Sequence, residues 1–245
     1  MKLVFWNIRS GGGYRVPEIA AQLKSWAPDL IALAEFRGTK ASVDLTERLR
    51  SFGFIYQLDT INKEKLAMNA LLLAAKVPLR QIDLSNAPTE PCRWLLATVE
   101  GKRPFTIGVM HVPNRVTKRK YPYFDAVMDV VNHWTLGPGL LVGDTNTGIP
   151  PLDGFSSPFT KEEIGWMNDL DAADWKDALR YLHGDKQVFT WYSHKKNGFR
   201  LDEAFFNQEL LPRLKSIDHQ WGKSATNPQR QDALSDHAAI LLELD

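Results

Sequence analysis

Residues 140–146 read Leu-Leu-Val-Gly-Asp-Thr-Asn, a short apolar run followed at once by glycine, aspartate and asparagine. The apolar run is typical of a buried strand, so the polar residues after it lie at the carboxyl end of that strand. Loops held at strand ends are where α/β proteins carry binding and catalytic residues. The stretch therefore predicts a sheet that presents Asp144 and Asn146 to a functional site.

The same arrangement recurs along the chain, because other polar residues also stand at the ends of apolar, β-prone runs. They are Asn7 after Leu3–Trp6, Glu35 after Leu30–Ala34, His111 after Phe105–Met110, Asp202 in the run Leu201–Phe206, and Asp236-His237 before Ala238–Leu244. So many acceptors and bases in one cleft repel one another unless a cation or an anionic substrate organises them. Carboxylate and amide oxygens without cysteine suit Mg²⁺ or Mn²⁺ rather than structural zinc.

Helical patterns separate these runs. Ile19, Leu23 and Trp26 share one helical face after Pro17, which suits the first turn of a helix, and a second amphipathic pattern ends at Gly53. Further strands are expected at residues 54–58, 69–75, 94–99 and 189–191. The order indicates β-sheets in the middle with helices outside. Because no linker or repeat interrupts the chain, we expect a single catalytic domain over residues 1–245.

Composition narrows the classes of protein. The chain has 245 residues, 44% of them hydrophobic, and a net charge of +1, which excludes a disordered polyelectrolyte. Nucleic-acid binding would need a local basic patch. Cys92 is the only cysteine, so an intrachain disulfide and a cysteine zinc site are excluded. No apolar run approaches the ~18 residues of a membrane span, and we expect a cytoplasmic monomer.

Six motifs occur in a fixed order along residues 3–244. They are Trp6-Asn7-Ile8, Ala34-Glu35, His111-Val112-Pro113-Asn114, Gly143-Asp144-Thr145-Asn146, Arg200-Leu201-Asp202 and Ser235-Asp236-His237. In this combination the chain resembles the endonuclease/exonuclease/phosphatase family, which includes exonuclease III and DNase I. The resemblance implies a four-layered α/β sandwich in which two packed mixed β-sheets are flanked by helices.

The resemblance also implies a metal-dependent phosphoester hydrolase that uses Mg²⁺, with Mn²⁺ as a substitute, and assigns roles to residues. Glu35 is the expected principal metal ligand, helped by Asn7 and Asp236. Asp144 and Asn146 are expected to position the attacking water and the phosphate. His237, paired with Asp202, is expected to act as general base or to stabilise phosphoryl charge, and His111 to bind a phosphate oxygen or protonate the leaving group.

Three features favour DNA as the substrate. Lys118-Arg119-Lys120 interleaves with tyrosines, the segment Asp177–His183 with Phe189–Trp191 resembles DNA-repair nucleases, and apolar residues flank the Arg-Leu-Asp motif. The residues expected to bind the substrate are Arg9, Asn114, Lys118, Lys120, Phe199, Arg200 and Leu201. The alternatives are that the basic run is a solvated helix start, that Phe199 belongs to the core, and that Asp202 is an ion-pair partner of Arg200.

The leading hypothesis is thus a Mg²⁺-dependent DNA nuclease of the exonuclease III or abasic-site endonuclease type. The alternative is a family phosphatase or phosphodiesterase for a small-molecule or lipid headgroup ester. It is motivated by His111, where the nuclease branch usually has tyrosine, and by the low net charge. A third hypothesis is a binding module that has the same fold but no catalytic activity. The intact set of polar motif residues argues against it.

Overall fold

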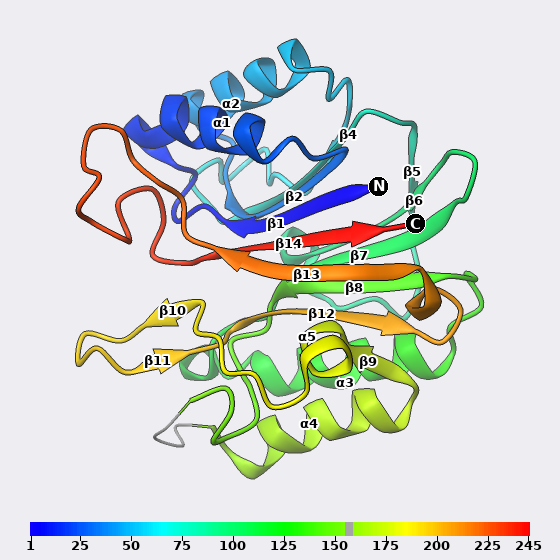
Figure 1. Cartoon of the computed structure of the whole chain (residues 1–245). Coiled ribbons are helices and arrows are strands. Elements are labelled where there is room, and N and C mark those ends of the chain that lie inside the picture. The colour runs from blue at the N-terminus through cyan, green and yellow to red at the C-terminus, as the bar shows by residue number, and fades with distance from the viewer. Residues whose placement is uncertain (155–158) are drawn as a thin grey trace.

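The computed structural model describes residues 1–154 and 159–245. Two six-stranded β-sheets pack against each other in the centre, and helices cover the outer face of each sheet (Figure 1). The chain is therefore a four-layered α/β sandwich, which confirms the expected fold class.

The first sheet has the strand order β13-β14-β1-β2-β4-β3. Its strands are β1 (Lys2–Asn7), β2 (Leu30–Phe36), β3 (Tyr56–Asp59), β4 (Ala70–Ala75), β13 (Leu214–Gln220) and β14 (Ala239–Leu244). β1 pairs with β2 in parallel and with β14 in the antiparallel sense, so the sheet is mixed.

The second sheet has the order β5-β6-β7-β8-β12-β9. Its strands are β5 (Leu79–Ile82), β6 (Trp94–Val99), β7 (Phe105–His111), β8 (Gly139–Asp144), β9 (Trp175–Asp177) and β12 (Asp202–Asn207). β7 and β8 are parallel, whereas β8 and β12 are antiparallel, so this sheet is also mixed. A small separate hairpin is formed by β10 (Trp191–Tyr192) and β11 (Gly198–Phe199).

Helices α1 and α2 cover the first sheet, and α3 and α4 cover the second (Figure 1). The helices are α1 (Val16–Trp26), α2 (Lys40–Ser51), α3 (Lys120–Asn132), α4 (Lys161–Ala172) and α5 (Ala178–His183), with short 3-10 turns at Gly13–Arg15, Pro91–Arg93, Arg115–Thr117 and Leu211–Arg213. Thr160 and Glu163 form a capping box that starts α4, because each side chain satisfies a free backbone N–H of the first turn.

The side-chain alternation of the strands builds the layers. In β1, Leu3 and Phe5 point into the core between the two sheets, whereas Val4 and Trp6 pack beneath α1 and α2. Successive residues of a strand face opposite sides, so a strand that is apolar throughout is buried on both faces. This explains why the continuous apolar runs predicted the central strands.

The sequence did not predict strands β5, β9 and β13, which lie at the edges of the two sheets, or helices α4 and α5. Helix α4 belongs to the outer layer over the second sheet, whereas α5 packs against the core between the sheets through Ala178 and Leu179. Within residues 1–154 and 159–245, no helix is both long enough and apolar enough to span a membrane.

Candidate active site

The polar residues at the strand ends converge on one edge of the two sheets. The parallel pairs β1·β2 and β7·β8 end at this edge, and β12 and β14 begin there because they run antiparallel to β8 and β1. Asp144 lies opposite both His111 and Asp202 in the strand register. A pocket of about 740 Å³ opens at this edge, and its lining includes Glu35, His111, Asn114, Asp144, Asn146, Phe199, Leu201, Asp236 and His237.

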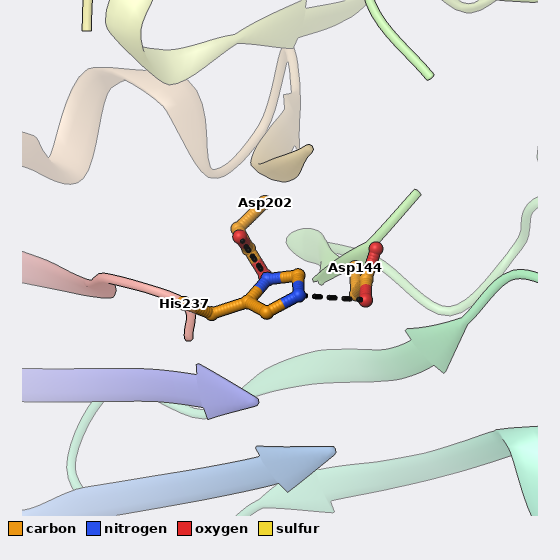
Figure 2. Close-up of side chains that lie close together, drawn as sticks. All are labelled: Asp144, Asp202 and His237. Atoms are coloured by element: carbon orange, nitrogen blue, oxygen red, sulfur yellow. Dashed lines mark hydrogen bonds and ion pairs between the residues drawn. The ribbon is translucent and has the colours of Figure 1, made fainter. Parts of the chain in front are cut away.

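His237 lies between two carboxylates (Figure 2). Its Nδ1 is 2.8 Å from Oδ2 of Asp202, and its Nε2 is 4.0 Å from Oδ2 of Asp144. The backbone carbonyl of His237 accepts a hydrogen bond from the Trp6 indole at 2.9 Å, which fixes the residue against β1. Burial by itself lowers the pKa of His237, but the Asp202 carboxylate outweighs burial, and the pKa rises to about 10.

Asp144 is the centre of the hydrogen-bond network. Its Oδ2 accepts from the Asn7 side-chain amide at 2.9 Å, and its Oδ1 accepts from the backbone N–H of Asn146 at 3.0 Å. The Nε2 atom of His111 lies 3.8 Å from the same carboxylate. Burial raises the pKa of Asp144 to about 7, although His237 acts in the opposite direction. A cation bound nearby would therefore favour the ionised form of this carboxylate.

Asn146 adopts a left-handed backbone conformation, with φ of +51°. Its side-chain amide donates to the carbonyl of Val112 at 2.9 Å, which ties the loop after β8 to the loop after β7. Its own carbonyl accepts a hydrogen bond of 2.7 Å from the ammonium of Lys120. Together with the hydrogen bond from its backbone N–H to Asp144, these two contacts hold a conformation that is uncommon for residues other than glycine.

Glu35 also has a positive φ, +56°, and lies at an irregularity where the register between β2 and β4 shifts. One of its carboxylate oxygens, Oε2, accepts from the backbone N–H of Ser10 at 2.7 Å. Ser10 belongs to a run of positive-φ residues, Arg9–Gly13, which turns the loop after β1 toward Glu35. The glycines at 11–13 therefore serve this turn, where a left-handed backbone favours glycine.

His111 is buried, and its pKa is held well below the usual value by burial and by the nearby cations Arg93 and His237. Its Nδ1 atom is also buried and has no hydrogen-bond partner in the described part of the chain. A neutral imidazole carries one N–H donor and one acceptor. His111 therefore faces the pocket as an uncharged group.

A group of donors here could hold a metal ion. Ligand atoms of Asp144, Asp202 and His237 lie within 4.8 Å of one another, and Oδ1 of Asp202 is buried without a partner among the residues described. This group differs from the expected metal ligands. Glu35 and Asp236 line the pocket outside it, and the Asn7 carboxamide is already engaged by Asp144 and by the backbone of Arg9.

Two of the expected substrate-binding residues require correction. Lys120 lines the pocket, but its side chain is 2% exposed and its ammonium lies 2.6 Å from Oε1 of Glu163, so its charge is already paired. Arg200 is also buried, and its guanidinium contacts the carboxylates of Asp153 and Asp177. Both cations neutralise buried acids, which a sequence reading of charge alone does not reveal.

The other expected substrate-binding residues fall into two groups. Asn114, Phe199 and Leu201 line the pocket. Arg9 and Lys118 are exposed on loops beside it, and the Arg9 guanidinium lies 4.0 Å from Asp236.

Sequence reasoning missed Arg93, Arg115, Glu163 and Ser193 in the pocket lining, and it favoured core packing for Trp191, which also lines the pocket. The spacing of Thr160 and Glu163 is a capping-box signal that predicts the start of α4. The position of Glu163 in the pocket wall follows only from the three-dimensional packing. For the remaining residues no local pattern distinguishes a pocket residue from a surface one.

No protein-family model matches the chain, and no curated protein matches it in sequence. Solved structures match over its whole length. The 3' phosphatase NExo from Neisseria, bound to a product DNA hairpin, has 20% sequence identity and a TM-score of 0.80, with 100% of this chain and 99% of that chain covered. An AP endonuclease from Archaeoglobus fulgidus has 16% identity and a TM-score of 0.82, with 100% and 99% covered. The APE2 catalytic domain from Xenopus laevis has 17% identity and a TM-score of 0.73, with 100% and 91% covered.

Proposed function

From the exonuclease III/DNase I-like fold that the chain shares with these structures, we propose that it is a Mg²⁺-dependent phosphodiesterase that acts on DNA. The observation that carries the proposal is the alignment of Asp202, His237 and Asp144 at the base of a pocket with further acids on its rim. Such an arrangement combines a histidine of fixed orientation with carboxylates able to hold a cation.

The proposed metal ligands are Glu35 and Asp236, with Asn7 supporting them through Asp144. Bound there, Mg²⁺ would neutralise phosphate charge and lower the pKa of a coordinated water. The donor set suits this ion because it is rich in oxygen and contains no cysteine. Ser10 donates its backbone N–H to Glu35, which leaves the other oxygen of that carboxylate for a cation.

The proposed catalytic residues act on the phosphate and the water. Asp202 accepts the Nδ1 proton of His237, which directs Nε2 toward Asp144 and the pocket. Because its pKa is raised to about 10, His237 carries a proton at neutral pH and stabilises the charge on the phosphoryl oxygens. It serves as general base only after it has lost that proton. Asp144 and Asn146 orient the water and the phosphate, and neutral His111 provides a hydrogen bond to a phosphate oxygen or to the leaving group.

The choice of DNA draws support from two observations. One structural neighbour was solved with a product DNA hairpin and another is an AP endonuclease. In this chain Phe159, Trp191, Phe199 and Leu201 form an apolar wall in the pocket, and such a wall suits a sugar extruded from a duplex. Cytoplasmic action as a monomer remains part of the proposal.

A second candidate function is hydrolysis of a small-molecule or lipid headgroup phosphoester. His111 favours it, because a buried neutral imidazole in the pocket can bind a terminal phosphate without any contact to neighbouring nucleotides. A substrate panel that contains phosphate monoesters and small diesters separates the two functions. Release of phosphate from the panel, together with no cleavage of DNA, would select the second candidate.

The direct test uses an end-labelled duplex with a single abasic-site analogue, incubated with Mg²⁺ or with EDTA. We expect a cut at the lesion that requires Mg²⁺ and is abolished by Asp144→Ala, with a loss on the order of 10³-fold or more. A Mg²⁺-dependent ladder would indicate a nuclease without lesion recognition. Intact DNA under every condition would reject DNA as the substrate.

A further inference from the structure

The β10–β11 hairpin projects away from the two sheets (Figure 1). It lies beside the pocket, because Trp191 and Phe199 of the hairpin are among the lining residues. Trp191 pairs with Phe199 across the hairpin, and both line the pocket. Trp191 also forms a β-bridge with His237, and Thr190 accepts the backbone N–H of Ala238 at 2.8 Å. The base of the hairpin is thereby fixed to the segment that carries the pocket histidine.

The tip of the hairpin is a closed turn with a positive charge. The backbone N–H of Ser193 donates to Asn197 at 2.9 Å, and that of Lys196 donates to Ser193 at 2.8 Å. His194, Lys195 and Lys196 are exposed on this turn, and neither lysine forms an ion pair with any residue that the structure describes. Unpaired lysines on an ordered turn attract a polyanion at little cost in conformational freedom.

An aromatic surface adjoins the tip. Because successive residues of a strand face opposite sides, Tyr192 points away from the pocket that Trp191 lines. Its ring is 6.0 Å from that of Trp221 at an interplanar angle of 33°, and the residue is 40% exposed. Lys223, two residues after Trp221, is exposed as well. We call Tyr192, Trp221, Lys195 and Lys196 the outer hairpin surface.

We propose that the outer hairpin surface binds a single-stranded segment of nucleic acid that continues out of the pocket. An exposed aromatic ring can stack an unpaired base of any sequence, while neighbouring lysines contact the backbone phosphates. Ser193 lines the pocket, and the charged residues of the turn follow it directly in the chain. A nucleic-acid strand that leaves the pocket on this side would therefore contact the turn first. A base within a duplex is already stacked and paired, so the rings select unpaired segments.

This inference rests on the proposed action on nucleic acid and names the kind of strand that the site accepts. A small phosphoester fills the pocket without reaching Tyr192 or the lysines, so its hydrolysis does not depend on this surface. The surface therefore favours a substrate with a single-stranded tail over a blunt duplex.

The experiment measures binding of labelled oligothymidylate and of a blunt duplex by fluorescence anisotropy in EDTA, over a range of salt concentrations. The variants are Tyr192→Ala, Tyr192→Phe and the double variant Lys195→Ala/Lys196→Ala. The matched control is Lys102→Ala/Arg103→Ala, two adjacent exposed cations in the turn before β7, at the opposite end of that strand from His111. Hydrolysis of a small diester with Mg²⁺ is measured in parallel.

We expect Tyr192→Ala to weaken oligothymidylate binding by about 5- to 150-fold, the range for loss of one stacked base, and Tyr192→Phe to retain most of it. The double lysine variant should reduce the salt slope by about 1.4, which is about 0.7 for each lost phosphate contact on a single strand. The blunt duplex, the small diester and the control variant should show no comparable change.

Unchanged oligothymidylate binding in Tyr192→Ala and in Lys195→Ala/Lys196→Ala would overturn the inference. An equal loss of affinity for the single strand and for the duplex would also overturn it. If Tyr192→Ala fails to fold, the exposed lysine variant decides alone. If the protein cleaves DNA but the hairpin variants bind oligothymidylate as tightly as wild type, this inference is rejected and the proposed function stands. If binding of oligothymidylate depends on the hairpin but no DNA is cleaved, the outer hairpin surface is confirmed as a binding surface and the proposed function is rejected.

Discussion

Replacement of Lys120 by methionine tests how far the pocket wall depends on a buried charge. The ammonium lies 2.6 Å from Oε1 of Glu163 and 2.7 Å from the carbonyl of Asn146, and its side chain is 2% exposed. Methionine keeps an unbranched side chain of similar length, so Lys120→Met removes the charge with little change in packing. Glu163 is then left as a buried carboxylate without its main cation.

The magnitude follows from that unpaired charge. Breaking a buried ion pair from one side destabilises a protein by about 3–5 kcal/mol. The second oxygen of Glu163 still accepts from the backbone N–H of Thr160 at 2.8 Å and lies 3.4 Å from Arg115, which places the loss toward the lower end. For a chain of this length about 2 °C of Tm corresponds to 1 kcal/mol, so a loss of about 3–4 kcal/mol should lower Tm by roughly 6–8 °C.

The assay is thermal unfolding of four proteins: wild type, Lys120→Met, Glu163→Gln and the double variant. Replacing both charged partners is far less harmful than replacing one, so the double variant should recover at least half of the Tm lost in Lys120→Met. Lys118→Met is the matched control, because Lys118 is exposed and such substitutions usually change stability by no more than about 0.5 kcal/mol. A Tm for Lys120→Met within about 2 °C of wild type, or no recovery in the double variant, would refute the reasoning.

Three further predictions concern catalysis, specificity and pH. Asp202→Asn should lower kcat for Mg²⁺-dependent cleavage by about 10³-fold or more, and it should also lower Tm because His237 loses its buried carboxylate partner; near-normal turnover would exclude the Asp202–His237 pair from catalysis. Phe199→Ala should impair cleavage at an abasic site and spare intact DNA, whereas equal losses in the two gel assays would assign Phe199 a structural role. Burial and the nearby Arg200 lower the pKa of His219 to about 4, so between pH 6.5 and pH 4 the unfolded chain binds a proton that the folded chain does not. Stability should therefore decrease by up to about 1.4 kcal/mol per pH unit as pH falls through this range, and urea midpoints for His219→Gln should show a shallower dependence.

The central strands were predictable because their burial on both faces leaves a continuous apolar run in the sequence. Strand β13 was missed for the converse reason. It lies at the edge of its sheet, only Leu214 and Ile217 of its seven residues are buried, and a bulge between Leu214 and Ser216 breaks the alternation. Edge strands such as β5 and β9 are short and carry little hydrophobic pattern. Local periodicity reports burial, so it detects the middle of a sheet better than its edges.

The strand-end polar residues were predictable as a group for a related reason, since the end of each apolar run fixes where its polar neighbour stands. The left-handed conformations of Glu35 and Asn146 were not, because they depend on partners distant in the chain, Ser10 and Lys120. The charged tip of the β10–β11 hairpin gave no signal either, because exposed lysines are common on loops. Its significance comes from its position beside the pocket.

In the Arg200-Leu201-Asp202 motif, three successive side chains have different roles at the edge of the sheets where the carboxylates gather. Arg200 is directed into the protein, where its guanidinium neutralises Asp153, Asp177 and Glu203. Leu201 lines the pocket, and Asp202 reaches His237. The buried guanidinium matters to the site because Glu203 in turn accepts a hydrogen bond of 2.7 Å from the hydroxyl of Thr145, the residue after Asp144. Without Arg200, the repulsion among the buried Asp153 and Glu203 and the partly buried Asp177 would act directly on the strand that positions Asp202 and on the loop that holds Asp144. The motif is therefore one unit in which an internal ion-pair network supports the two carboxylates on either side of His237.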